Sequence, residues 1–141
     1  MKKIITFVTM LLSILCVNLP SRAEASSAQE MYAAASGFIS TLDEMNSILA
    51  GVYNQQTADA AAEPLKRAAN RFFAQLQIIQ SMKPDGPMDK AMEQKIMALM
   101  AKGERGQATF MKHCQRIGQK NAYGSQKLIQ TFLYIGSMGK K

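Results

Sequence analysis

The side chains that could carry out chemistry are few in this sequence. His113 is the only histidine, and Cys114 follows it directly. Adjacent residues on a helix point about 100° apart, so these two side chains do not converge on one metal ion. The sequence also lacks the residue spacings of zinc proteases, serine hydrolases, dithiol oxidoreductases and phosphate-binding loops. We therefore expect a protein that is not an enzyme and that holds no metal.

Basic side chains dominate the second half of the chain. From residue 64 onward there are fourteen Lys and Arg against four Asp and Glu, and no acid follows Glu104. A surface of this kind attracts anionic envelope polymers, lipid head groups or acidic proteins. The alternative is that these charges only keep a helix soluble and pair with the acidic first helix. The candidate binding residues are Arg105, Lys112, Arg116, Lys120, Lys127, Lys140 and Lys141.

The N-terminus has the pattern of a secretory signal peptide. Two lysines precede an uncharged apolar run over 4–19, and Ala23-Glu24-Ala25 follows as a cleavage pattern. The run is shorter than the ~20 apolar residues that span a bilayer, so no membrane segment is expected after cleavage. We expect a signal peptide over 1–25 and a single domain over 26–141, exported by a bacterium to the periplasm or beyond. Nucleic acid is not an expected partner there, since no motif that reads it is present.

Signal cleavage would remove Cys16 and leave Cys114 as the only cysteine. A disulfide within the remaining chain is then impossible, so the fold must be held together by packing alone. Because Cys114 falls at an apolar helical position, we expect it to be a buried free thiol.

Two apolar stripes with helical spacing predict an antiparallel helical hairpin. The first helix is expected over 28–53 and the second over 58–82, with Thr57 as the N-cap of the second. Pro64 is expected to bend the second helix without ending it, because the apolar spacing continues through this position. A connection this short makes the two helices antiparallel neighbours. The stripes are Met31, Ala35, Phe38, Leu42, Met45, Leu49 and Val52, then Ala58, Ala62, Leu65, Ala69, Phe72, Leu76 and Ile79.

A cluster of Pro and Gly over 83–87 ends the hairpin, and a second helical half follows it. One long helix is expected over 87–119, and a break at 103–106 would give two shorter helices as the alternative. Ser125 is a suitable N-cap for a last amphipathic helix over 126–136. The predicted fold is therefore all-α and bundle-like, with the hairpin packed against a long helix and a short C-terminal helix.

Several short segments combine helix and cap patterns. They are Met45-x-x-Ile48-Leu49-Ala50, Thr57-Ala58-x-Ala60-Ala61-x-x-x-Leu65, Arg116 and Asn121-x-Tyr123-Gly124-Ser125-x-x-Leu128. In these segments the chain resembles small secreted α-helical proteins of unknown function from bacteria of the Planctomycetes and Verrucomicrobia group. The resemblance implies an exported helical envelope protein, and it carries no catalytic residues.

The hairpin pattern, the signal peptide and the stretch Asn121-Ala122-Tyr123 are also similar to the periplasmic b-type cytochrome that folds as a four-helix bundle. In that family, haem is bound by a Met near the start of the first helix and a His near the end of the last. The resemblance implies Met31 as one candidate ligand, but Gly124-Ser125 stands where the family's His would follow the tyrosine. His113 would have to serve instead. A haem or small-ligand carrier is therefore the alternative to surface binding.

Overall fold

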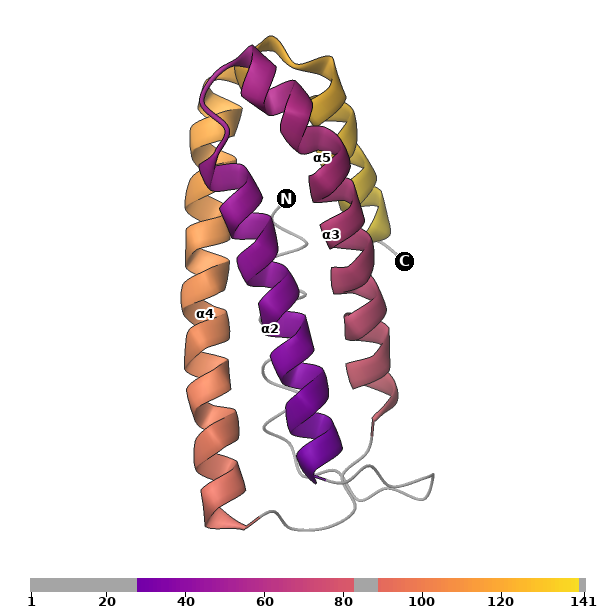
Figure 1. The fold of residues 1–141 in the computed structure, drawn as a ribbon, viewed down its shortest axis with the longest axis vertical. Coiled ribbons are helices and arrows are strands. Elements are labelled where there is room, and N and C mark those ends of the chain that lie inside the picture. Colours follow the sequence, from indigo (N-terminus) through magenta and orange to yellow (C-terminus); the bar gives the residue numbers. More distant parts are fainter. Residues whose placement is uncertain (1–27, 83–88, 140–141) are drawn as a thin grey trace.

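The computed structural model describes residues 28–82 and 89–139, and over these ranges the protein is all-α (Figure 1). The predicted fold class is thus confirmed. The signal peptide predicted over 1–25 and the candidate residues Lys140 and Lys141 lie outside the described residues. The elements are α2 (Ala28–Ala50), α3 (Gln55–Ser81), α4 (Lys90–Gln119), a short turn η1 (Asn121–Gly124) and α5 (Gln126–Met138).

Helix α2 lies between α3 and α4 and packs extensively against both (Figure 1). Helices α2 and α3 are antiparallel, as the short connection requires. The chain returns in α4 parallel to α2, and the short α5 then packs against α3. The apolar core runs along the inside of these pairings and includes side chains from all four helices.

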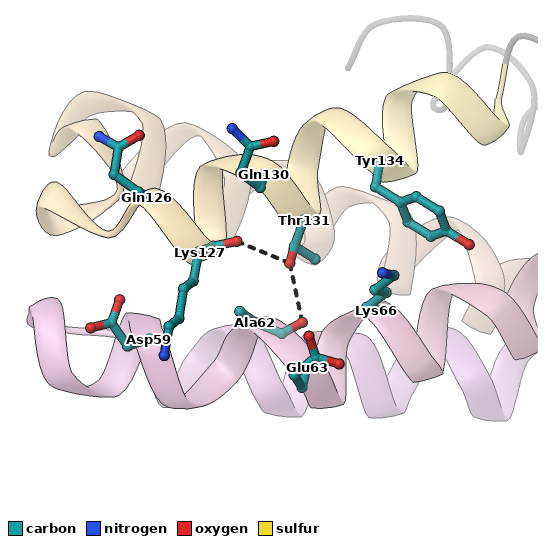
Figure 2. A pocket seen from close by; sticks show the side chains of 9 residues that line it. All are labelled: Asp59, Ala62, Glu63, Lys66, Gln126, Lys127, Gln130, Thr131 and Tyr134. Atoms are coloured by element: carbon teal, nitrogen blue, oxygen red, sulfur yellow. Dashed lines mark hydrogen bonds between the residues drawn. The ribbon is translucent and has the colours of Figure 1, made fainter.

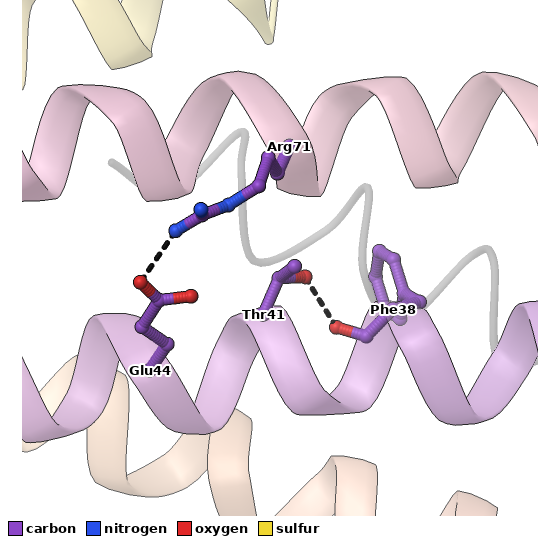
Figure 3. Close-up of polar contacts among 4 residues, drawn as sticks. All are labelled: Phe38, Thr41, Glu44 and Arg71. Carbon is purple, nitrogen blue, oxygen red and sulfur yellow. Dashed lines mark hydrogen bonds and ion pairs between the residues drawn. The ribbon is translucent and has the colours of Figure 1, made fainter.

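Both predicted stripes of the hairpin are confirmed, because all fourteen of their residues are buried. The two stripes meet in an aromatic contact between α2 and α3. The ring centroids of Phe38 and Phe72 lie 4.5 Å apart in this contact. Thr41 is buried beside them, and its hydroxyl donates to the Phe38 carbonyl at 2.7 Å (Figure 3). The polar group is therefore satisfied within its own helix and needs no partner from α3.

The helix ends differ from the predicted ones because other residues cap them. Helix α2 ends at Ala50, not near residue 53. The N-cap of α3 is Asn54, not Thr57: the Asn54 side chain accepts from the Thr57 amide, and the Thr57 hydroxyl accepts from the Asn54 amide. This reciprocal capping box moves the start of the helix forward to Gln55. Pro64 lies inside the continuous helix, as expected.

Helix α4 is one continuous helix, so the alternative of two shorter helices is wrong. It begins at Lys90, after the N-cap Asp89, whose side chain accepts from the Met92 amide. The start expected at residue 87 is therefore three residues too early. Helix α5 is capped by Ser125 as predicted, but it extends to Met138 instead of ending near residue 136.

Gly106, in the segment where a break in α4 was considered, has a packing function. Gly106 is buried where α4 crosses α2, and a Cβ atom added there would lie 3.0 Å from the Leu42 Cδ2 atom. At the same place the Asn46 side chain of α2 donates to the Gly106 carbonyl at 2.8 Å. The absence of a side chain at Gly106 thus allows the two helix backbones to approach.

Two adjacent acidic residues of α2 form ion pairs with the helices on either side of it. Glu44 pairs with Arg71 of α3 (Figure 3), and Asp43 pairs with Lys102 of α4 at 3.2 Å. All four side chains are about half exposed, so each pair is worth at most about 1 kcal/mol. The expected attraction between an acidic first helix and basic partners is present, but packing dominates the stability.

None of the helices over the described ranges combines the length and apolar character needed to cross a membrane.

The close approach at Gly106 generates a stability prediction. Gly106→Leu should lower the free energy of unfolding by about 1–3 kcal/mol, because the added side chain must displace Leu42. Gly118→Leu is the matched control on the same helix, since no atom lies within 4 Å of a Cβ there. The control should be neutral or stabilising by up to about 1 kcal/mol. Urea unfolding followed by circular dichroism measures both, and equal stabilities would contradict the close packing.

Candidate functional site

The five candidate cations that the structure describes do not form one surface. They divide into three places: the exposed side of α4, the contact between α4 and the end of α2, and the side of α5 that faces α3. Arg105, Lys112 and Lys120 are in the first place, Arg116 is in the second and Lys127 is in the third.

The first place is the exposed side of α4. Arg105 and Lys112 are two turns apart and project away from the side on which Gly106 and Phe110 are buried. Lys120 is exposed at the C-cap of the same helix. Helix α4 lies at the edge of the helix array (Figure 1), and all three residues are exposed. We call Arg105, Lys112 and Lys120 the α4 cationic face.

Arg116, by contrast, is held by hydrogen bonds to other parts of the chain. Its guanidinium donates to the carbonyls of Leu49 at 2.8 Å and Val52 at 2.6 Å, at the C-terminal end of α2. It also donates to the Tyr123 hydroxyl at 3.1 Å. The last carbonyls of a helix have no partner within it, and they carry partial negative charge, so a fixed cation is favoured there. We therefore assign Arg116 a structural role.

The segment that Arg116 contacts has an unusual backbone. Residues Asn121, Ala122 and Tyr123 have φ values of 49°, 51° and 55°, and Gly124 follows at 81°. Left-handed conformation costs a residue with a side chain roughly 1–2 kcal/mol, so three such residues in succession need compensation. Three contacts hold the turn: the buried Ala122, the Arg116 bond to Tyr123, and the Ser125 amide bond to the Ala122 carbonyl at 2.9 Å. The turn reverses the chain from α4 into α5.

Lys127 lines a groove between α3 and α5 that sequence reasoning did not find (Figure 2). The groove has a volume of about 600 Å³, within the range of ligand sites in proteins. Its residues come from positions about 65 apart in the chain, and no local pattern marks such a pairing. The lining residues are Asp59, Ala62, Glu63, Lys66, Gln126, Lys127, Gln130, Thr131 and Tyr134.

Hydrogen bonds fix the two walls of the groove relative to each other. The buried Ser125 hydroxyl donates to Asp59 at 2.5 Å and accepts from the Leu128 amide at 3.1 Å. The Thr131 hydroxyl is 3.2 Å from the Ala62 carbonyl of α3 (Figure 2). At the far end, the Tyr134 hydroxyl donates to an Asn70 side-chain oxygen at 2.7 Å. The groove is thus a defined feature of the α3–α5 contact.

His113 and Cys114 do not form a reactive pair. Cys114 is a buried free thiol, as predicted, and its burial raises its pKa to about 12. Burial and the nearby Arg116 charge lower the pKa of His113, whose Nδ1 atom lies 3.3 Å from the Arg116 guanidinium. A neutral imidazole beside a protonated thiol lacks the thiolate that nucleophilic chemistry requires. Over residues 28–82 and 89–139, no group of three or more His, Cys, Asp or Glu could hold a metal ion.

Met31 and His113 cannot bind the same haem iron. Arg116, about one turn beyond His113, contacts Leu49 near the end of α2. Met31 is in the first turn of that helix, which places it about 27 Å from Leu49 along the axis. Because α2 and α4 run parallel (Figure 1), the two candidate ligands lie near opposite ends of the helix pair. The ligand set implied by the cytochrome resemblance is therefore not assembled.

Comparisons with known proteins add no relative: no family model matches the chain, and no curated protein or solved structure is significantly similar to it.

The contacts of Arg116 predict that it stabilises the fold. Arg116→Gln should lower the free energy of unfolding by about 2–3 kcal/mol, because it removes charge-assisted bonds to two carbonyls at the end of α2. Arg105→Gln removes the same charge from an exposed position on the same helix and should change stability by less than about 0.5 kcal/mol. Denaturant titration of both variants measures the difference. If both losses were small, the structural role of Arg116 would be wrong.

The raised pKa of Cys114 predicts that its thiol reacts slowly with alkylating reagents. In a Cys16→Ser chain at pH 8, only about one Cys114 in ten thousand would be a thiolate in the folded state, so alkylation by iodoacetamide should require unfolding. Because the folded pKa lies above the unfolded one, the folded state keeps its proton while the unfolded state loses it. Stability should therefore fall as pH rises from about 8.5 toward 12. Rapid labelling of the native protein at pH 8 would show that the thiol is accessible and ionised.

Proposed function

We propose that this protein is exported, is not an enzyme, and binds an anionic envelope component through the α4 cationic face. The observation that carries the proposal is the exposure of Arg105 and Lys112 on the side of α4 opposite its buried residues Gly106 and Phe110. Over the parts of the chain that the structure describes, neither these two residues nor Lys120 form an ion pair. Their charge remains available to a ligand, and the signal-peptide pattern would bring them to the cell envelope.

Several other cations support this choice because their surroundings differ. Arg71 and Lys102 are each paired with a carboxylate of α2. Arg116 is bonded to backbone carbonyls, and Lys127 shares its groove with Asp59 and Glu63. An approaching polyanion would meet negative charge beside each of these four positions or find the cation already engaged. The α4 cationic face instead presents three exposed cations on one helix, with no ion pair over the described residues.

Binding through this face should depend strongly on salt. The protein should bind vesicles made of equal parts phosphatidylglycerol and phosphatidylcholine at low ionic strength and be released as salt increases. Raising salt from about 0.01 M to about 1 M shortens the screening length from about 30 Å to about 3 Å. Cosedimentation measures the bound fraction, with phosphatidylcholine vesicles as the neutral control. No binding to the anionic vesicles at low salt would contradict the mechanism.

A charge-matched pair of variants locates the site. Neutralising the face with Arg105→Gln, Lys112→Gln and Lys120→Gln should remove about 3 kcal/mol of binding free energy, or about 100-fold in affinity. The control removes the same charge from α3 and α5 with Lys66→Gln, Arg67→Gln and Lys127→Gln, and it should bind nearly as well as the unmodified chain. Equal losses in both would mean that net charge, and not the α4 cationic face, governs binding.

A further inference from the structure

The groove between α3 and α5 contains charged side chains of both signs. Asp59 and Glu63 lie one turn apart on α3, Lys66 follows them, and Lys127 extends from α5 toward α3 (Figure 2). The groove therefore combines two carboxylates with two ammonium groups. Such a site suits a ligand that carries both charges, and its acids disfavour the polyanions that the α4 cationic face attracts.

Two of the four charges are already engaged. Asp59 accepts the Ser125 hydroxyl at 2.5 Å, and the Lys66 ammonium lies 4.7 Å from the centroid of the Tyr134 ring. Glu63 and Lys127 are exposed, and over the described ranges their charged groups make no ion pair. A carboxylate on one wall and an ammonium on the other thus remain available to a ligand.

The base and length of the groove restrict the size of that ligand. The Ala62 methyl group, Thr131 and the Tyr134 ring supply apolar surface between the charged groups. From Asp59 to Lys66 the groove follows α3 for about 10 Å. An extended peptide advances about 3.3 Å per residue, so about three residues would occupy this length.

We propose that the α3–α5 groove binds a small zwitterion, namely a peptide of two or three residues or a free amino acid. The ligand's carboxylate lies against Lys127 and its ammonium against Glu63, each through charge-assisted hydrogen bonds. Gln126 and Gln130 also line the groove on the α5 side. This site is separate from the α4 cationic face, so it can be present whether or not that face binds an envelope component.

Four forms of one peptide test the proposal on the full chain. The probes are tri-alanine with both ends free, with an acetylated amine, with an amidated carboxylate, and with both ends blocked. Titration calorimetry should show the tightest binding for the free peptide. Blocking either end should weaken binding by about tenfold, because each block removes one charge-assisted contact.

Single variants assign each end of the peptide to its partner. The Lys127→Gln variant should bind the free and the amidated peptide with about equal affinity. It should still bind the free peptide more tightly than the acetylated one. The Glu63→Gln variant should bind the free and the acetylated peptide with about equal affinity, and it should still bind the free peptide more tightly than the amidated one. Arg67→Gln is an exposed control on α3 outside the groove and should keep both preferences. Comparing ligands on the same variant separates a lost contact from a change in folding, because a folding defect weakens all four probes together.

Two results would overturn the proposal. One is the absence of binding by any form at concentrations up to about 10 mM, which would detect dissociation constants of about 1 mM. The other is equal binding of all four forms, which would show only nonspecific apolar contact. Neither result would affect vesicle binding, so a failure here is distinguishable from a failure of the proposed function.

Discussion

The broad apolar face of α2 is the constraint on which the positions of the other helices depend. Residues on this face must leave water, and the arc is too wide for one neighbour to cover: Ile39 and Leu42 are buried as fully as Phe38 and Met45. Helices α3 and α4 therefore pack on its two sides, where Phe72 supplies the aromatic contact and Gly106 the close approach. The α4 cationic face follows from this arrangement, because among the described helices α4 packs mainly against α2, on one of its sides.

The arginines of α4 lie in two kinds of surroundings that the sequence alone does not separate. Arg116 uses its planar guanidinium to bond several backbone and side-chain oxygens at once, and it joins the end of α2 to the left-handed turn before α5. Arg105, only three turns earlier on α4, faces outward and has no such contact. Both residues lie on nearly the same side of α4, so the distinction depends on what lies level with each of them: Arg116 is level with the carbonyls at the end of α2. That relation arises only when distant parts of the chain come together.

The elements that the sequence predicted well are those governed by local periodicity. All residues of the two hairpin stripes are buried, because burial along a helix follows its own 3.6-residue repeat. Features that join distant segments were missed: the Arg116 contacts with Leu49 and the groove beside Lys127 each span more than sixty residues. The α3 cap was misplaced by three residues because Asn54 and Thr57 are both good capping residues, and their reciprocal bonds decide the start. The separation of Met31 from His113 and the engagement of Arg116 were missed for the same reason, since residue type does not reveal distance.

An anionic ligand should bind this protein on the exposed side of α4. An NMR titration of the isotopically labelled chain with a soluble anionic polysaccharide can locate the contact, because each residue reports separately. The largest shifts should centre on Arg105 to Lys112, fade at high salt, and leave the exposed side of α3 around Arg67 unchanged. Shifts centred on α3 and α5, or shifts of equal size at every exposed lysine and arginine, would contradict it.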